Sequence, residues 1–297
     1  MQIDTLFAQL MPPAPRVVAV AAAQDDAVLS AVSEAAARGI ATPILCGDRT
    51  RIEAVAHAGR IDIAGFDIIE TRDDKSAAAA AVSLVREGRA HMLMKGKLQT
   101  ADLLRAVLNK ETGLRGSGIL SHVGVLHSPI LERTFLLTDA AILTYPDLKQ
   151  KAAMIDNAVA VARGIGIESP KVAALAAVEV VNPDMQATLD AAALTLMNRR
   201  GQIKGCVVDG PMAIDLALSQ EAVAHKGFVS EVAGAADILL FHNIDAANSA
   251  LKIFTIAGQC LFGGVVMGAA APIVLTSRSD SAESKLFSIL CAASTCR

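Results

Sequence analysis

Residues 16–46, RVVAVAAAQDDAVLSAVSEAAARGIATPILC, decide the fold. They contain an unbroken apolar run, Arg16–Ala22, an amphipathic segment, Asp25–Arg38, and a second apolar run, Pro43–Cys46. Short apolar runs of this kind are typical of strands buried on both faces of a parallel sheet. The middle segment opens with two aspartates and ends in Arg38-Gly39, which favours a helix because acidic starts and basic ends complement the helix dipole. The stretch therefore predicts strand, helix and strand.

The same alternation continues along the chain. Two further helices are predicted at Asp73–Arg86 and Pro183–Arg200, each with a glycine shortly after its last basic residue. The remaining predicted strands are His91–Met94, Thr134–Leu143, Val172–Val178, Gly205–Val208, Asp237–Phe241 and Pro272–Thr276. The alternation predicts an α/β fold with doubly wound, mostly parallel sheets. Because the strands outnumber those of a comfortable single sheet, we expect two lobes.

The composition excludes several classes of protein. The net charge of the 297 residues is −3, and aromatic residues make up only 3% with no Trp, so we expect no nucleic-acid partner. The five cysteines are scattered and odd in number, which indicates reduced thiols in a cytoplasmic protein. The start of the chain does not resemble a signal peptide. Ile253–Ser277 carries no charge, but its glycines and Pro272 favour a helix end, a Gly-rich turn and a buried strand over a membrane span.

Polar residues follow five of the predicted strands. Ligands of such sheets bind just past the carboxyl ends of the strands, so these segments predict a polar cleft. They are Lys95–Thr100, Glu179–Pro183, Asp209–Pro211, His242–Asp245 and Ser277–Ser281.

Two of these segments suit an anion. Lys95-Gly96-Lys97 places two ammonium groups beside a glycine, and Ser277-Arg278 places a hydroxyl and a guanidinium just before a predicted helix start. A helix N-terminus and a forked guanidinium both favour phosphate. The alternatives are two solvated lysines and an ion pair from Arg278 to Asp280 or Glu283.

Ser121-His122 forms a weaker candidate. It follows Gly116-Ser117-Gly118, which is half of a dinucleotide fingerprint without the third glycine. Arg115 and Arg133 flank this region and could add positive charge, although a surface role is the favoured explanation for both.

Other chemistries lack their signatures. The sequence contains no G-x-S-x-G, H-E-x-x-H or G-x-x-x-x-G-K-[ST] motif, and its six histidines lack the tight spacing of zinc ligands. We therefore expect no metal site and no nucleophile motif.

Several stretches together resemble the phosphate acyltransferases that interconvert acyl-CoA and acyl phosphate, most of all their butyryl branch. The similarity runs from about Arg16 to the end of the chain. Its strongest pieces are Met94–Lys97 with Thr100, Glu179–Pro183, Gly201–Cys206 running into Val208–Pro211, and Pro272–Ser281 with Lys285.

The resemblance implies a two-lobed fold similar to isocitrate and isopropylmalate dehydrogenases, with the active site in the cleft between the lobes. The first lobe is expected at 1–129 plus 265–297 and the second at 130–264. The family's Ser-Arg pair falls on Ser277 and Arg278. The acid that follows this pair in the acetyl branch is replaced here by Ser284, so either Asp280 or Glu283 substitutes as the base or the reaction requires no base. No cofactor is expected, and the substrates are acyl-CoA and inorganic phosphate. Family members are commonly homo-oligomers, from dimers upward.

The expected roles follow from these observations. Ser277, Arg278 and Asp280 are predicted to be catalytic, and transfer is expected to be direct within a ternary complex because no nucleophile motif is present. The residues predicted to bind phosphate or CoA are Lys95, Lys97, Thr100, Ser121, His122, Arg133, Asn243 and Lys285.

Three alternatives stay open. The first is a phosphate acetyltransferase that prefers acetyl-CoA, since one methylene changes discrimination by only about 1–3 kcal/mol. The second is an NAD-dependent decarboxylating dehydrogenase of the same fold, and the third is a two-lobed binder of small ligands.

Overall fold

The computed structural model describes residues 3–116, 118–277 and 280–296. Contacts between Cα atoms group the chain into two compact units. Unit 1 comprises Met1–Gly118 and Phe262–Arg297, and unit 2 comprises Ile119–Leu261. The chain therefore leaves unit 1, builds all of unit 2 and returns.

Unit 1 contains a mostly parallel sheet. Its strand order is β3-β2-β1-β4-β11-β10, and only the pair β10 and β11 is antiparallel among these described strands. The strands are β1 (Arg16–Ala21), β2 (Ala41–Gly47), β3 (Asp67–Glu70), β4 (Met92–Lys95), β10 (Leu261–Met267) and β11 (Ile273–Val274). The sheet places the ends of β1, β4 and β11 beside one another.

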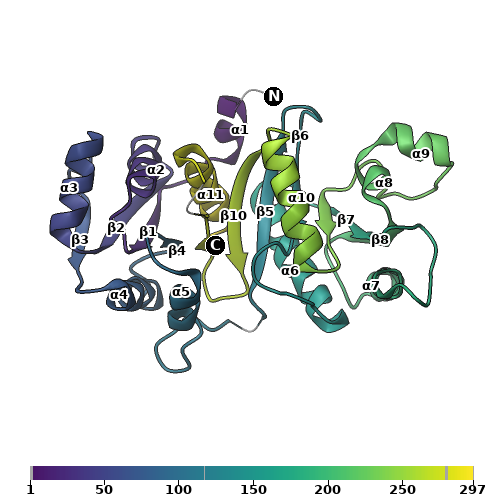
Figure 1. Ribbon diagram of the computed structural model, residues 1–297, viewed down its shortest axis with the longest axis horizontal. Coiled ribbons are helices and arrows are strands. Elements are labelled where there is room, and N and C mark those ends of the chain that lie inside the picture. The colour runs from purple at the N-terminus through teal and green to yellow at the C-terminus, as the bar shows by residue number, and fades with distance from the viewer. Residues whose placement is uncertain (1–2, 117, 278–279, 297) are drawn as a thin grey trace. The chain divides into compact units, whose positions relative to one another are not determined.

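Helices cover both faces of this sheet. In Figure 1, α2, α3 and α11 lie on one face, and α4 and α5 lie on the other. The helices are α1 (Ile3–Leu10), α2 (Asp26–Ala37), α3 (Arg49–Gly59), α4 (Asp74–Arg86), α5 (Thr100–Val107) and α11 (Ala282–Thr295). The expected doubly wound arrangement is thus present in unit 1.

The strands of unit 2 lie in the order β5-β6-β9-β7-β8. All described pairs in it are parallel except β5 with β6. Its strands are β5 (Ser121–Ser128), β6 (Arg133–Thr138), β7 (Lys171–Leu175), β8 (Val207–Met212) and β9 (Ile238–Leu240). Its helices are α6 (Leu148–Gly164), α7 (Gln186–Arg199), α8 (Ile214–Leu218), α9 (Gln220–Lys226) and α10 (Ile244–Ile256). Helices α6 and α7 lie on one face and α10 on the other (Figure 1).

Helix starts follow the acidic residues that the sequence analysis used. Asp25 caps α2 by accepting the N–H of Val28, and Asp73 caps α4 in a reciprocal capping box with Ser76. Such caps satisfy N–H groups that have no partner within the helix. These local signals are why the predictions for α2 and α4 lie within one residue of the observed bounds.

Some predicted elements differ from the structure. The predicted strand 134–143 ends at Thr138, because the next residue, Asp139, turns the chain: its carboxylate accepts the N–H groups of Ala141, Ile142 and Leu143. Asp209–Pro211, expected to follow a strand, lies inside β8.

Three strands, β3, β5 and β10, escaped prediction. The Gly-rich turn expected between 253 and 277 is partly strand, since Gly263 and Gly264 belong to β10. A Cβ atom at Gly263 would lie 3.0 Å from the Phe287 ring and 3.2 Å from Cys291 Sγ, so glycine allows α11 to pack closely there. Within the described chain, every helix is too short or too polar to cross a lipid bilayer.

Candidate active site

The candidate active site of unit 1 lies at the carboxyl ends of β1, β4 and β11. The N–H of Gly96 donates to the carbonyl oxygen of Ala21 (2.8 Å), and the N–H of Lys97 donates to that of Ala22 (2.7 Å). These bonds fasten the segment after β4 to the segment after β1. The site is therefore fixed by backbone hydrogen bonds before any side chain contributes.

Gly96 is required by this close approach. A Cβ atom at position 96 would overlap the carbonyl oxygens of both Ala21 and Ala22, which are backbone atoms and cannot swing aside. We expect Gly96→Ala to lower the stability by about 1–3 kcal/mol, the usual cost of overpacking, and to displace Lys95. The matched control is Gly118→Ala, because a Cβ there would have its nearest neighbour at 3.8 Å. Equal melting temperatures of the two variants would contradict this explanation.

Two buried lysines lie at this edge. Lys95, the last residue of β4, is 5% exposed, and Lys285 on α11 is 3% exposed. Burial lowers the pKa of Lys285, while the carboxylates of Asp280 and Asp25 raise it. Buried ammonium groups are uncommon in proteins, so the two lysines make this edge the candidate site for an anion.

Lys285 holds the loop that follows β11. Its Nζ donates to the carbonyl oxygens of Ser277 (3.1 Å) and Asp280 (2.6 Å). Within the loop, the N–H of Ser277 donates to Asp280 Oδ2 (2.7 Å). Arg278, which lies between these fixed points in sequence, is outside the described residues. The structure thus gives the predicted Ser-Arg segment two anchored ends.

The other predicted residues of unit 1 lie close in sequence to the same edge. Lys97 is exposed in the turn after β4, and Thr100 is the first residue of α5 and half-buried. Six predicted site residues of unit 1 lie at the end of β4 or follow β4 or β11 in the chain: Lys95, Lys97, Thr100, Ser277, Asp280 and Lys285.

Ser121 and His122 are buried in unit 2. They begin β5, and their exposures are 0% and 2%. Ser121 Oγ accepts a hydrogen bond from Asn157 Nδ2 (2.8 Å), and the N–H of His122 donates to Asp139 Oδ2 (2.9 Å). Both residues are held by the protein itself, which favours a structural role for them.

Asn243 and Arg133 lie at opposite edges of the unit 2 strands. Asn243 follows β9 and caps α10 by accepting the N–H of Ala246 (3.0 Å). Arg133 begins β6, and its guanidinium donates to the carbonyl oxygen of Ala236 (2.5 Å) and lies 3.5 Å from Asp237 Oδ1. Because β6 and β9 are parallel, Arg133 is at the amino edge of the unit 2 sheet and Asn243 at the carboxyl edge.

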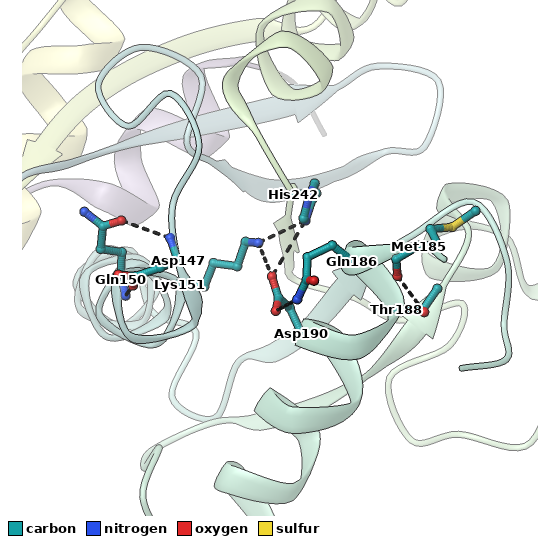
Figure 2. Close-up of polar contacts among 8 residues, drawn as sticks. All are labelled: Asp147, Gln150, Lys151, Met185, Gln186, Thr188, Asp190 and His242. Carbon is teal, nitrogen blue, oxygen red and sulfur yellow. Dashed lines mark hydrogen bonds and ion pairs between the residues drawn. The ribbon is translucent and has the colours of Figure 1, made fainter. Parts of the chain in front are cut away.

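Sequence reasoning missed a buried polar cluster in unit 2. Lys151 Nζ lies 2.5 Å from Asp190 Oδ2 and 2.9 Å from His242 Nδ1, and Gln186 Nε2 donates to Asp190 Oδ1 (2.8 Å). Figure 2 shows these side chains converging from α6, α7 and the segment after β9. His242 stood in a predicted strand exit, but nothing in the sequence links Lys151 to Asp190 across 39 residues.

Comparison with known proteins identifies the family. The family model described as "Phosphate acetyl/butaryl transferase" matches residues 2–82 and 74–293. The chain belongs to this family. The phosphate butyryltransferase of Clostridium acetobutylicum is 52% identical over 276 residues, 93% of this chain and 92% of that protein. The predicted family and the predicted enzyme class, an acyltransferase, are confirmed.

Solved structures agree with the fold. The crystal structure of a branched-chain phosphotransacylase from Enterococcus faecalis V583 matches with a TM-score of 0.83 and 34% identity, covering 94% of this chain and 98% of that one. A 4-hydroxythreonine-4-phosphate dehydrogenase from Burkholderia phymatum matches with a TM-score of 0.56 and 13% identity, covering 95% and 98%. The second likeness shows the fold alone, a mixed α/β fold with mostly parallel strands.

Proposed function

We propose that this acyltransferase moves a short acyl group between coenzyme A and inorganic phosphate, with butyryl or a similar chain favoured. The observation that carries the proposal is the 52% identity, over nearly the whole of both chains, to an enzyme named phosphate butyryltransferase. The carboxyl edge of unit 1 supports it, since buried Lys95 and the anchored loop around Arg278 provide positive charge for an anion. The two-lobed arrangement with the active site between the lobes, and a homo-oligomeric state, remain predictions.

In the proposed reaction, a phosphate oxygen attacks the thioester carbonyl, a new C–O bond forms, and the C–S bond then breaks. Arg278, with Lys95 or Lys97, holds the phosphate and spreads its charge. Ser277 donates a hydrogen bond to the oxyanion or to the departing sulfur. Lys285 acts as a positioning residue, because its ammonium group is engaged with the carbonyl oxygens of the loop.

The departing group of this reaction is a thiolate. The CoA thiol has a pKa of roughly 8.5, by analogy with cysteine, so the leaving group needs little help near neutrality. Asp280 lies in the same loop and is the proposed base for the CoA thiol in the reverse direction. One of its carboxylate oxygens, Oδ2, also accepts the N–H of Ser277.

Direct transfer is also supported by the cysteines. Burial, followed by the nearby charge of Asp156, raises the pKa of Cys206 to about 11, and burial raises that of Cys296 to about 11. The thiolate is the nucleophilic form of cysteine, so these thiols are poor nucleophiles at neutral pH. Labelled acyl-CoA is therefore expected to leave no covalent adduct on Cys206 or Ser277, and a trapped adduct would contradict direct transfer.

The test of the proposed function is a thiol-release assay. Acetyl-, propionyl- and butyryl-CoA are each supplied with and without phosphate, and free thiol is measured. We expect phosphate-dependent release that is fastest with a chain of several carbons. Fastest release with acetyl-CoA would indicate the acetyl specificity instead. Equal release without phosphate would identify a thioesterase, and reduction of NAD with a 2-hydroxy acid would identify a dehydrogenase.

A further inference from the structure

One face of α10 carries two exposed apolar side chains. Ile253 is 64% exposed and Ile256 is 78% exposed, both near the end of the helix. The opposite face is already packed on unit 2, because Leu251 is buried and the Phe254 ring lies edge-on to Phe135 of β6, with ring centroids 5.2 Å apart. Single apolar residues on a surface are ordinary, but a contiguous group marks an interaction site. The neighbours of the two isoleucines therefore decide whether this face is such a site.

The tip of the β5–β6 hairpin extends the exposed apolar group. Ile130 is 73% exposed and Leu131 is 39% exposed, and both lie in the turn between the two strands. This turn is close to the end of α10, because the Cys260 thiol, just after the helix, forms a hydrogen bond with Ser128 at the end of β5. Figure 1 shows the end of α10 beside the hairpin. Large apolar side chains from two elements are thus gathered at this end of the helix.

The beginning of α10 presents a different surface. Tyr145, in the loop after β6, is 70% exposed, and its hydroxyl donates a hydrogen bond to Asp245 Oδ2 (3.0 Å) in the first turn of the helix. The N–H of Ile244 donates to the carbonyl oxygen of Thr144 (3.0 Å), which fastens this loop to the helix. Between the two ends, Ser249 is exposed and has a short side chain, so another helix can approach closely there.

The charges along this face are complementary to themselves. Asp245 lies in the first turn of α10, and Lys252 is exposed on the same side of the helix, because about seven residues make two turns. When two such helices pair antiparallel about a two-fold axis near Ser249, the aspartate of each helix faces the lysine of the other. A parallel pair would instead place like charges opposite each other, which is unfavourable.

The apolar groups match in the same antiparallel arrangement. An axis near Ser249 brings the end of one helix over the beginning of the other, so Ile253 and Ile256 of one protomer meet Tyr145 of its partner. Tyrosine is enriched at interfaces, because its ring buries a large apolar area while its hydroxyl keeps a polar partner. The face therefore fits a second copy of itself through both its charges and its apolar side chains.

We propose that this chain forms a symmetric homodimer through unit 2, with α10 of one protomer antiparallel to α10 of its partner. We call the surface involved the α10 face, and its principal residues are Ile130, Tyr145, Asp245, Lys252, Ile253 and Ile256. Two-fold symmetry makes each contact occur twice, as in most soluble homodimers. The inference assigns a surface to the predicted homo-oligomeric state, and it does not rest on the proposed function.

Sedimentation velocity of the full-length protein at micromolar concentration is the first test. The wild type is expected to sediment as a dimer or as a larger assembly that contains this dimer. Ile253→Glu/Ile256→Glu is expected to halve the sedimenting mass, with the dimer dissociation constant raised at least about 100-fold. The matched control is Val229→Glu, because Val229 is 96% exposed in the same unit but lies after α9, outside the α10 face. Circular dichroism checks that both variants stay folded.

An exchange of charges tests the antiparallel arrangement. Lys252→Glu and Asp245→Lys each place like charges opposite each other, so each is expected to raise the dimer dissociation constant about tenfold. The double variant Asp245→Lys/Lys252→Glu restores opposite pairs with the signs exchanged, so we expect its dissociation constant within about threefold of the wild type. A local structural effect of one change would not be rescued by the other.

Three results would overturn the proposal. A monomeric wild type would leave the α10 face to a partner of another sequence. Wild-type mass in Ile253→Glu/Ile256→Glu would place the interface elsewhere on the chain. A double charge variant that associates as weakly as the single variants would exclude the antiparallel pairing of the two helices.

Discussion

Replacing Lys151 by methionine is expected to lower the free energy of unfolding by about 3–5 kcal/mol, the usual effect of removing one partner of a buried ion pair. The side chain of Lys151 is 2% exposed, and its Nζ provides hydrogen bonds to both Asp190 and His242. Methionine fills similar space without a charge, so Asp190 would keep its buried carboxylate with only Gln186 as a remaining donor. Thermal and denaturant unfolding measure this loss.

Two further variants test the cause of that loss. Lys149→Met, in the same turn of α6 but exposed, is expected to change stability by less than about 0.5 kcal/mol. The double variant Lys151→Met/Asp190→Leu is expected to be more stable than the single one, because it removes the unpaired charge as well. A double variant as unstable as the sum of its single changes would show that packing, and not charge pairing, explains the effect.

Replacing Arg278 by alanine is expected to reduce phosphate-dependent thiol release about 100–1,000-fold, the range seen when one donor to a developing charge is removed. The guanidinium can present two parallel donors to a phosphate, and no other arginine occurs in the segment that Lys285 anchors. Arg278→Lys keeps the charge and loses the fork, so we expect intermediate activity. The readouts are kcat/KM for phosphate and the melting temperature, which should stay at the wild-type value.

The control for Arg278 is Arg51→Ala. Arg51 lies on α3 with a side chain that is 73% exposed, and its guanidinium forms an ion pair with Asp48. Its replacement is expected to leave activity within about twofold of the wild type. If Arg278→Ala also loses less than tenfold, the phosphate is held by other groups, and Lys95 and Lys97 become the first candidates.

Much of the fold could be predicted because its signals are local. The apolar runs at 16–22 and 91–94 match β1 and β4 closely, and the acidic caps at Asp25 and Asp73 mark the starts of α2 and α4. Strand β5 (Ser121–Ser128) was missed because its histidines, serines and glycine look polar in sequence, although every residue in it is buried.

In the candidate site, too, some residues could be predicted from the sequence and others could not. Lys95 and the Ser277-Arg278 segment stand in short stretches, directly after apolar runs, and are visible in the sequence. The role of Lys285 as an anchor is not visible there, because it depends on contacts with carbonyl oxygens eight and five residues earlier in the chain. The position of Arg133 is likewise not visible in the sequence: the structure places it at the amino edge of the unit 2 strands, where its guanidinium contacts Ala236 and Asp237.

By itself the sequence determined the alternation of strands and helices, the family and the positively charged segments of unit 1, because each of these is visible in short stretches of neighbouring residues. Only the tertiary structure decided that Lys151, Asp190 and His242 form one cluster, and that Lys285 holds the loop on either side of Arg278. The physical reason is that an ion pair or a buried hydrogen bond depends on distances of about 3 Å between atoms, and residues 39 or 91 positions apart reach such distances only when the chain folds.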